Sequence, residues 1–256
     1  MNSPFIKNMT IETLLPTPDI FDAKRILCIQ PHYDDADIAA GGILSQLVKN
    51  GAELFYLTVT DDLMGVVDSS MSKEAAAQAL KNDQFATGKM IGVKEHFWCG
   101  YPDAGEYNYF ALRRDILKYI RMLKPDYIFT ADPWLTYEGH RDHIQTGLAA
   151  VEAVILAGAV RIPSSDPQVD EAYRGHDIQG VAFYFTREPN YIADITSTWE
   201  TKMNAIRCYK AQFGSQEMEQ LLGWVDAKSR QVAQGKPFTH GEPLKILHPG
   251  ALHGGL

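Results

Sequence analysis

The chain has 256 residues, of which 45% are hydrophobic and 22% charged, a composition typical of one large or two small folded domains and unlike that of a disordered protein. Its 24 basic and 32 acidic residues give a net charge of −8, which argues against a nucleic-acid or anionic-membrane surface. No apolar run reaches the ~18 residues of a membrane span, and the first residues lack a signal-peptide core. Three widely spaced cysteines predict reduced thiols and a cytoplasmic location.

Apolar periodicity predicts a chain that alternates between strands and helices. After a lead-in over residues 1–22, short apolar runs predict strands at 25–30, 53–60, 96–98, 127–130, 181–185 and 191–195. Helical spacing predicts helices at 38–50, 72–91, 110–123, 143–157, 198–212 and 215–234. Residues 161–179 are predicted to form a loop. Residues 236–256 are predicted to form a C-terminal tail that is apolar enough to pack against another surface.

This alternation favours an α/β fold: a Rossmann-like, mostly parallel sheet with helices on both faces, in a single domain over residues 1–256. Ligands of such sheets bind beyond the carboxyl ends of the strands. The loops that follow residues 30, 60, 98 and 130 are therefore the places where functional side chains are expected.

Two of these loops are rich in histidine and aspartate. The first has the sequence PHYDD at 31–35, and the second has DPWLTYEGHRDH at 132–143. Imidazole and carboxylate ligands suit a borderline divalent ion such as zinc, and three protein ligands with an open fourth position are typical of a catalytic site. Any one of these residues alone is more simply interpreted as a helix cap. The combination of H-x-x-D and H-x-x-H in two strand-end loops predicts a metal site.

With these motifs the sequence resembles the LmbE-like zinc N-deacetylases of the PIG-L superfamily, which remove acetyl groups from N-acetylglucosamine-type sugars. The resemblance covers nearly the whole chain and is greatest to the diacetylchitobiose deacetylase subgroup, through segments such as QPH at 30–32, TD at 60–61, DPWL at 132–135 and PNY at 189–191. It implies one Zn²⁺ per chain, a small amino-sugar substrate, and a homo-oligomer (trimer or hexamer) with the C-terminal tail at the interface.

The resemblance also implies roles for individual residues. Three residues are implied metal ligands: His32, Asp35 and His143. Three are implied catalytic residues: Asp34 as general base, His140 facing the oxyanion, and Asp142 orienting His140. Three are implied substrate contacts: Asp103, Trp134 and, from a neighbouring subunit, His253. These roles suit amide hydrolysis, because zinc lowers the pKa of bound water to about 7 and an adjacent carboxylate then takes its proton.

The sequence departs from the family pattern at several positions. Tyr33 and Arg141 stand where proline is usual, and Asp62 replaces the glycine of a Thr-Asp-Gly segment. Leu80 stands near an expected arginine, and the loss of that arginine indicates a changed substrate or a weaker site. None of these positions is an implied metal ligand.

Two other interpretations stay open. Five aspartates near the strand ends form an oxygen-rich set that would suit Mg²⁺ and a phosphate ester: Asp34, Asp35, Asp37, Asp61 and Asp62. Histidines 32 and 143 would be unusual ligands for that ion. The departures from the family pattern also fit a non-catalytic sugar-binding protein on a deacetylase scaffold. A dinucleotide site is excluded, because no Gly-x-Gly-x-x-Gly turn follows the first strand.

Overall fold

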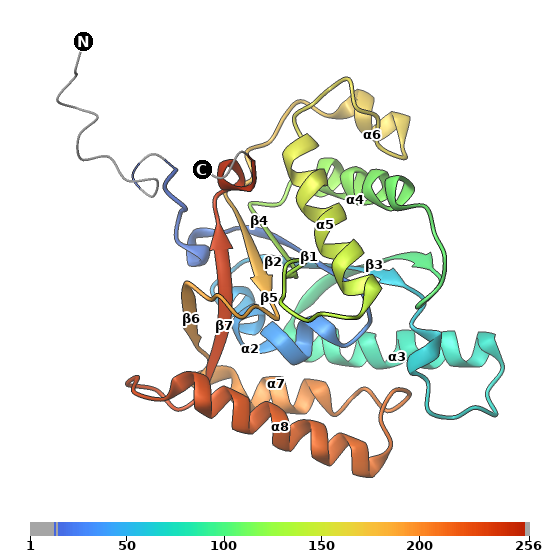
Figure 1. The fold of residues 1–256 in the computed structure, drawn as a ribbon, viewed down its shortest axis with the longest axis vertical. Helices are drawn as coiled ribbons and strands as arrows, with labels where there is room; N and C mark the ends of the chain where they lie inside the picture. The colour runs from blue at the N-terminus through green and yellow to red at the C-terminus, as the bar shows by residue number, and fades with distance from the viewer. Residues whose placement is uncertain (1–12, 14, 254–256) are drawn as a thin grey trace.

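A seven-stranded sheet runs through the computed structural model, which describes residues 13 and 15–253. The strand order is β3-β2-β1-β4-β5-β7-β6 (Figure 1). The strands are β1 (Arg25–Gln30), β2 (Glu53–Thr60), β3 (Val93–Tyr101), β4 (Tyr127–Ala131), β5 (Gly180–Tyr184), β6 (Tyr191–Asp194) and β7 (Gly241–Leu247). β1 to β5 are mutually parallel, and β7 is antiparallel to both β5 and β6. The predicted mostly parallel α/β sheet is therefore confirmed.

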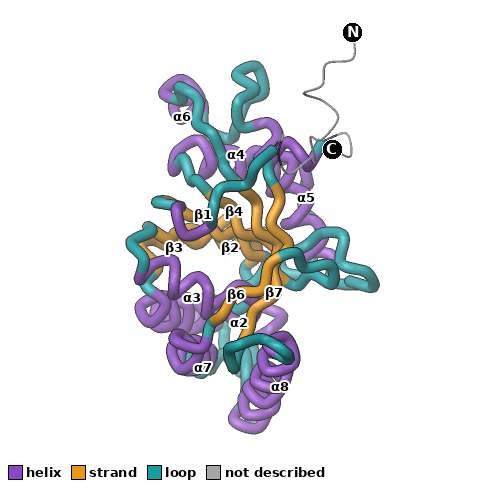
Figure 2. Tube along the Cα trace, turned by 90° about the vertical axis from the view of Figure 1, so that its left-hand side faces the viewer, coloured by secondary structure: helices purple, strands orange, loops and turns teal. Residues whose placement is uncertain are grey.

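Helices cover both faces of the sheet (Figure 2). They are α2 (Asp35–Lys49), α3 (Lys73–Ile91), α4 (Tyr109–Leu123), α5 (Arg141–Leu156), α6 (Pro167–Ala172), α7 (Trp199–Ile206) and α8 (Ser215–Ala233). Short 3-10 turns are η1 (Ile20–Asp22), η2 (Leu63–Gly65), η3 (Thr196–Thr198) and η4 (Pro249–Leu252). α2, α3 and α7 pack on one face, and α4 and α5 pack on the other. Among the described residues, no helix is long and apolar enough to cross a bilayer.

The strand β1 is buried on both faces. Ile26 and Cys28 join the core under α2, α3 and α7, whereas Leu27 and Ile29 join the core under α4 and α5. Alternate side chains of a strand point to opposite faces, so a strand covered on both faces has a continuous apolar sequence. This is why the first strand was predictable with its observed bounds.

Local signals explain the ends of two helices. Ser72 caps α3, where its hydroxyl accepts a hydrogen bond from the Ala75 amide at 3.2 Å, and Gly92 ends that helix at φ +98°. α2 begins at Asp35, three residues before the predicted start. Its first turn carries Asp35 and Asp37, which interrupt the apolar periodicity although negative charge stabilises a helix N-terminus.

The prediction of a C-terminal tail is wrong for residues 241–247. These residues form β7, which lies between β5 and β6 and pairs with both. Pro243 lies within this strand, and proline weakens a strand prediction. Leu244 is fully buried there, so the apolar residues of the segment pack within the sheet. The implied interface role of the tail stays a prediction, and residues 254–256 lie outside the described part of the chain.

Other boundaries differ as well. The predicted loop over 161–179 contains α6, which Asp166 caps through hydrogen bonds from two amides. The strand predicted at 96–98 is longer and runs from Val93 to Tyr101. The helix predicted at 198–212 is shorter and ends at Ile206. Most of the predicted lead-in, residues 1–12 and 14, lies outside the described residues. Its last turn forms η1, in which Ile20 is buried.

Arg121 ties α4 to the segment that follows α5. Its side chain is 2% exposed and makes an ion pair with Asp170 of α6 at 2.6 Å. Its guanidinium also donates hydrogen bonds to four carbonyl oxygens near the end of α5, those of residues 156, 157, 159 and 162. The planar fork of arginine suits this set of acceptors. One buried cation therefore satisfies the last carbonyl of α5 and three carbonyls of the segment that follows it.

We expect Arg121→Ala to lower the free energy of unfolding by about 3 kcal/mol or more, because it leaves a half-buried carboxylate and several carbonyls without their donor. Arg113→Ala on the same helix is the matched control. Its ion pair with Glu152 is more exposed and is worth at most about 1 kcal/mol. Urea unfolding of both variants measures the difference. Equal losses in the two variants would contradict the role given to Arg121.

Candidate active site

Four loops meet beyond the carboxyl ends of the parallel strands. They follow β1, β2, β3 and β4, as the strand topology predicts. β1 and β4 are neighbours in the sheet, with Ile29 paired to Thr130. The loops that leave these two strands therefore start side by side, although about 100 residues separate them in the sequence.

The three implied metal ligands come together at the carboxylate of Asp35. His32 Nδ1 lies 3.1 Å from Asp35 Oδ2, and His143 Nε2 lies 3.4 Å from Asp35 Oδ1. Burial alone raises the pKa of Asp35, but His143 and His32 outweigh it and hold this pKa well below its usual range. Both histidines thus direct a ring nitrogen at one buried carboxylate.

Each of these histidines has a carboxylate at its other ring nitrogen. His32 Nε2 lies 3.2 Å from Asp103 Oδ1 and 3.6 Å from Asp142 Oδ2. His143 Nδ1 lies 3.2 Å from Glu138 Oε2. Ligating histidines usually donate their second N–H to such a carboxylate, which fixes the tautomer and leaves the first nitrogen free to bind metal. The ligand atoms close enough to hold one ion belong to His32, His140 and His143, or to His32, His140, Asp103 and Asp142, and Asp35 lies beside two of these histidines.

Glu138 and Phe185 were not singled out in the sequence. Glu138 is part of the second motif, five residues before His143. A carboxylate so near a motif histidine could have been recognised as its partner. Phe185, directly after β5, has φ +55° and places its ring parallel to the His143 ring, at 3° and 5.8 Å between centroids. A bulky residue in the left-handed region is rare and concentrates at functional sites. No sequence pattern indicates this conformation.

His140 lies beside the other two histidines. Its ring centroid is 4.6 Å from that of His32 and 5.0 Å from that of His143, and one ring nitrogen from each residue lies within 4.8 Å of the others. The His140 side chain is 43% exposed, far more than those of its neighbours. Burial and the charges of His32 and His143 lower its pKa. The three rings thus form one cluster whose most open member is His140.

Asp142 is nearer to His32 than to His140. Its carboxylate accepts hydrogen bonds from the Ala104 amide and the Tyr107 hydroxyl, both at 2.8 Å, and is 1% exposed. It lies 3.6 Å from His32 and 4.0 Å from His140 Nδ1. The position of Asp142 is therefore fixed, and it is shared between two histidines instead of serving His140 alone.

Asp34 is buried at the N-cap of α2. Burial and the charge of Asp35 raise the pKa of Asp34, and a hydrogen bond from Gln212 opposes the rise. Gln212 Nε2 also donates to Asp62 Oδ2 at 2.8 Å. Burial and the charge of Asp34 raise the pKa of Asp62 as well. A carboxylate with a raised pKa is suited to take up a proton near neutral pH.

Two departures from the family pattern are in direct contact. Asp62, at the position of the usual glycine, has φ +54° and accepts a hydrogen bond from the Tyr33 amide at 3.0 Å. A proline in place of Tyr33 would have no such N–H to satisfy. The Tyr33 ring is buried in the core, and its carbonyl accepts a hydrogen bond from Tyr209 at 2.7 Å. The loop is therefore held firmly without its proline.

Leu80, near the expected arginine, is fully buried in the core. A side chain at this position therefore packs inside the protein and does not line the site. The neighbouring Lys81 extends over the ring of Trp98 at 5.0 Å. The other departure, Arg141, is the exposed first residue of α5.

Of the three implied substrate contacts, one lies at the centre of the site and two are exposed. Asp103 is at the centre of the site, where it contacts His32 and accepts a hydrogen bond from the Met64 amide at 3.1 Å. Trp134 is 57% exposed on the loop after β4, with its ring edge-on to Phe183 at 5.7 Å. His253 is exposed, after a turn that packs against α5. Its contribution to a neighbouring subunit, and the oligomer itself, stay predictions.

Comparison with known proteins shows the family to which the chain belongs. The family model for PIG-L, described as GlcNAc-PI de-N-acetylase, matches residues 27–154. A diacetylchitobiose deacetylase of Thermococcus kodakarensis is 35% identical over 192 residues, 75% of this chain and 71% of that protein. A 1D-myo-inositol 2-acetamido-2-deoxy-alpha-D-glucopyranoside deacetylase of Segniliparus rotundus is 28% identical over 169 residues, 54% of this chain and 52% of that protein.

A solved structure agrees with these relatives. The N,N'-diacetylchitobiose deacetylase of Pyrococcus horikoshii, in complex with an inhibitor, matches this fold with a TM-score of 0.83 and 33% identity. The match covers 93% of this chain and 89% of the other. On its fold, its site loops and these similarities, the chain belongs to the PIG-L family.

Proposed function

We propose that the chain is a zinc-dependent hydrolase that removes the N-acetyl group from an N-acetylglucosamine-type sugar or a small glycoside of one. The observation that carries the proposal is the approach of His32 and His143 to the two oxygens of Asp35, at 3.1 and 3.4 Å. Membership of the PIG-L family and the named activities of the relatives support the same reaction.

One Zn²⁺ per chain would be held by His32, Asp35 and His143. Two imidazoles and one carboxylate are a ligand set of catalytic zinc sites, and the ion there supplies Lewis acidity and activates water. Asp103 acts on this set from outside, because it lies within hydrogen-bond distance of the second nitrogen of His32. Asp142 lies 3.6 Å from the same nitrogen, and Glu138 lies 3.2 Å from the second nitrogen of His143.

The chain's own residues supply the proton transfers. Asp34 accepts the proton of the attacking water on its carboxylate, a role that its burial and raised pKa favour. His140, the most exposed histidine of the cluster, donates a hydrogen bond to the oxygen of the acetamide carbonyl as negative charge develops there. The leaving amine then takes a proton from one of these two residues.

The magnesium alternative is less well supported, because most of its aspartates are already engaged. Asp37 accepts hydrogen bonds from the hydroxyls of Tyr56 and Tyr209. Asp61 accepts one from the Asp103 amide at 3.0 Å, and Asp62 accepts one from the Tyr33 amide. These carboxylates stabilise loops and the core, and they do not form a free oxygen cage for Mg²⁺.

Purified protein should contain about one zinc ion per chain and release acetate from N-acetylglucosamine or diacetylchitobiose, since three ligands with an open position are typical of catalytic zinc. Chelation should abolish the release and added Zn²⁺ should restore it. Metal analysis and an enzymatic acetate assay measure both effects. Full acetate release after exhaustive chelation would overturn the proposal. So would a phosphatase activity that Mg²⁺ alone restores to the chelated protein.

Asp34→Asn should lower kcat by about 10²–10⁴-fold, the usual contribution of a general base. The zinc content should stay near that of the wild type, because Asp34 is not among the ligands proposed here. His143→Ala is the contrasting variant and should lose both zinc and activity. Loss of zinc in Asp34→Asn would show that this residue ligates the metal instead.

A further inference from the structure

The carboxylate of Asp61, directly after β2, holds the loop that carries Asp103. The Asp61 amide donates a hydrogen bond to the Tyr101 carbonyl at 2.7 Å, so this residue continues the pairing of β2 with β3. Asp61 Oδ1 accepts hydrogen bonds from the amides of Asp103 and Leu63 at 3.0 and 3.4 Å. The carboxylate therefore extends from a backbone that the sheet fixes, and it binds the loops after both strands.

The Asp103 carboxylate connects these loops to the proposed metal site. Its Oδ2 accepts a hydrogen bond from the Met64 amide at 3.1 Å, and its Oδ1 lies 3.2 Å from His32 Nε2. The Asp103 side chain is 5% exposed. One of its oxygens thus has a partner in the loop after β2, and the other has a partner at the site. Together with the contacts of Asp61, these hydrogen bonds set the orientation of Asp103.

The backbone directly after Asp103 is in an unfavourable conformation. Ala104 has φ +51°, in the left-handed region that residues other than glycine rarely adopt. Its amide donates a hydrogen bond to the Asp142 carboxylate at 2.8 Å. Two carboxylates, those of Asp61 and Asp142, therefore hold consecutive amides of this loop. Such strain persists only where the surroundings hold it in place, so the loss of one carboxylate should allow the loop to relax.

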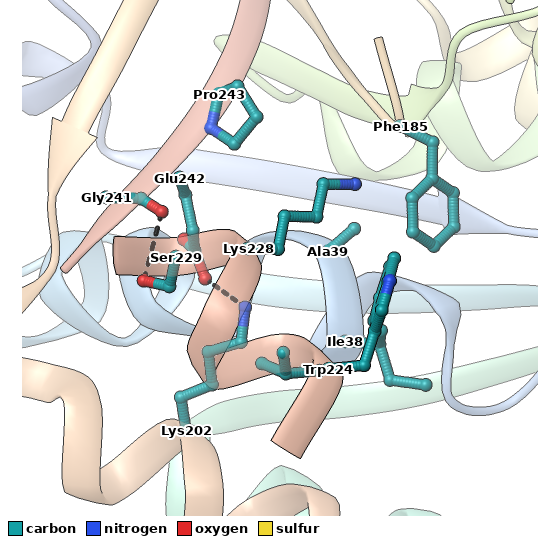
Figure 3. Close-up of a pocket in the computed structure, with 11 residues that line it drawn as sticks. Ile38, Ala39, Phe185, Lys202, Trp224, Lys228, Ser229, Gly241, Glu242 and Pro243 are labelled. Carbon is teal, nitrogen blue, oxygen red and sulfur yellow. Dashed lines mark hydrogen bonds and ion pairs between the residues drawn. The ribbon is translucent and has the colours of Figure 1, made fainter. Parts of the chain in front are cut away.

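The helix that begins with Asp35 is held by other contacts (Figure 3). Buried Glu242 of β7 accepts hydrogen bonds from the amides of Gly42 and Ile43 in α2, at 2.9 and 2.8 Å. Lys202 Nζ lies 2.6 Å from the same carboxylate. These contacts join the middle of α2 to β7 and α7, and they do not involve the loop after β2. A change at Asp61 should therefore leave α2 in place.

We propose that Asp61 is a positioning residue of the metal site, which acts through Asp103 on the ring of His32. The proposal rests on the zinc-dependent function proposed above and adds a residue to its site. A carboxylate that accepts the second N–H of a ligating histidine fixes the tautomer and the orientation of its ring. Asp61 determines where that carboxylate lies. Its contribution should therefore be measurable as metal affinity, although Asp61 is not itself among the proposed ligands.

The test is the Kd for Zn²⁺, measured by competition with a chromophoric chelator. Asp61→Ala removes the acceptor of the Asp103 amide, and its Kd should rise by about 10–100-fold, the usual cost of losing support for a ligating histidine. Asp61→Asn keeps an oxygen that can accept this amide, and its Kd should stay close to the wild-type value. An unchanged Kd in Asp61→Ala, or an equal rise in Asp61→Asn, would overturn the proposal.

Asp126→Ala is the matched control. Asp126 Oδ2 also accepts hydrogen bonds from two backbone amides, those of Lys24 and Arg25 at 2.7 and 2.9 Å. These residues lie at the starts of β1 and β4, at the opposite end of the sheet from the site. This variant should unfold at a lower urea concentration than the wild type but keep its Kd for Zn²⁺. A similar rise of the Kd in both alanine variants would show a general loss of stability and refute the positioning role.

A cobalt spectrum reports on the arrangement of the ligands. The visible absorption bands of protein-bound Co²⁺ change with the number and geometry of its ligands. At saturating Co²⁺ these bands should differ from the wild type in Asp61→Ala but not in Asp126→Ala, and identical bands in all three proteins would contradict the proposal. Neither measurement needs a substrate. If the wild type binds zinc but releases no acetate, the proposed reaction fails while the zinc affinities still decide the role of Asp61. If the wild type binds no zinc, both proposals fail.

Discussion

The contact of Asp35 with His32 and His143 is the interaction on which the rest of the site depends. It joins the start of α2, and the loop before it, to the start of α5, and it exists because β1 and β4 are neighbours in the sheet. Charge is concentrated around it: a carboxylate lies within 3.2 Å of the second ring nitrogen of each histidine, and buried Asp34 directly precedes Asp35 in the sequence. The strand order thus determines which loops and helix starts lie next to one another, and these segments supply the side chains of the site.

Much of the fold was predictable because its strands are covered on both faces. β1 and β2 each contain four consecutive apolar residues and have the bounds predicted for them. β7 was missed because Pro243 and half-buried positions remove the pattern of a central strand. Its place in the sheet depends on pairing with strands far away in sequence, and no local pattern records that. The same applies to α6, a short helix held by Arg121.

That the two motifs lie close together was predictable from the sequence, but the pairings of their side chains were not. The resemblance to the family implied His32, Asp35 and His143 as one ligand set, and they lie near one another because each follows a parallel strand or begins the next helix. Spacing does not give side-chain directions. Asp142 therefore lies nearer to His32 than to His140, and Asp103 contacts a histidine at the centre of the site. Phe185 depends on a single backbone angle, which residue type does not reveal.

The hydrogen bond between the Tyr33 amide and the Asp62 carboxylate makes two departures from the family pattern a single change. Tyrosine with glycine would leave a buried N–H without an acceptor, which costs about 1–3 kcal/mol. Proline with aspartate would keep a left-handed backbone without the bond that offsets its strain. Either mixed state is therefore less stable than both matched pairs. In evolution the two positions should exchange together, so that tyrosine at the first position in a homologue indicates an acceptor at the second.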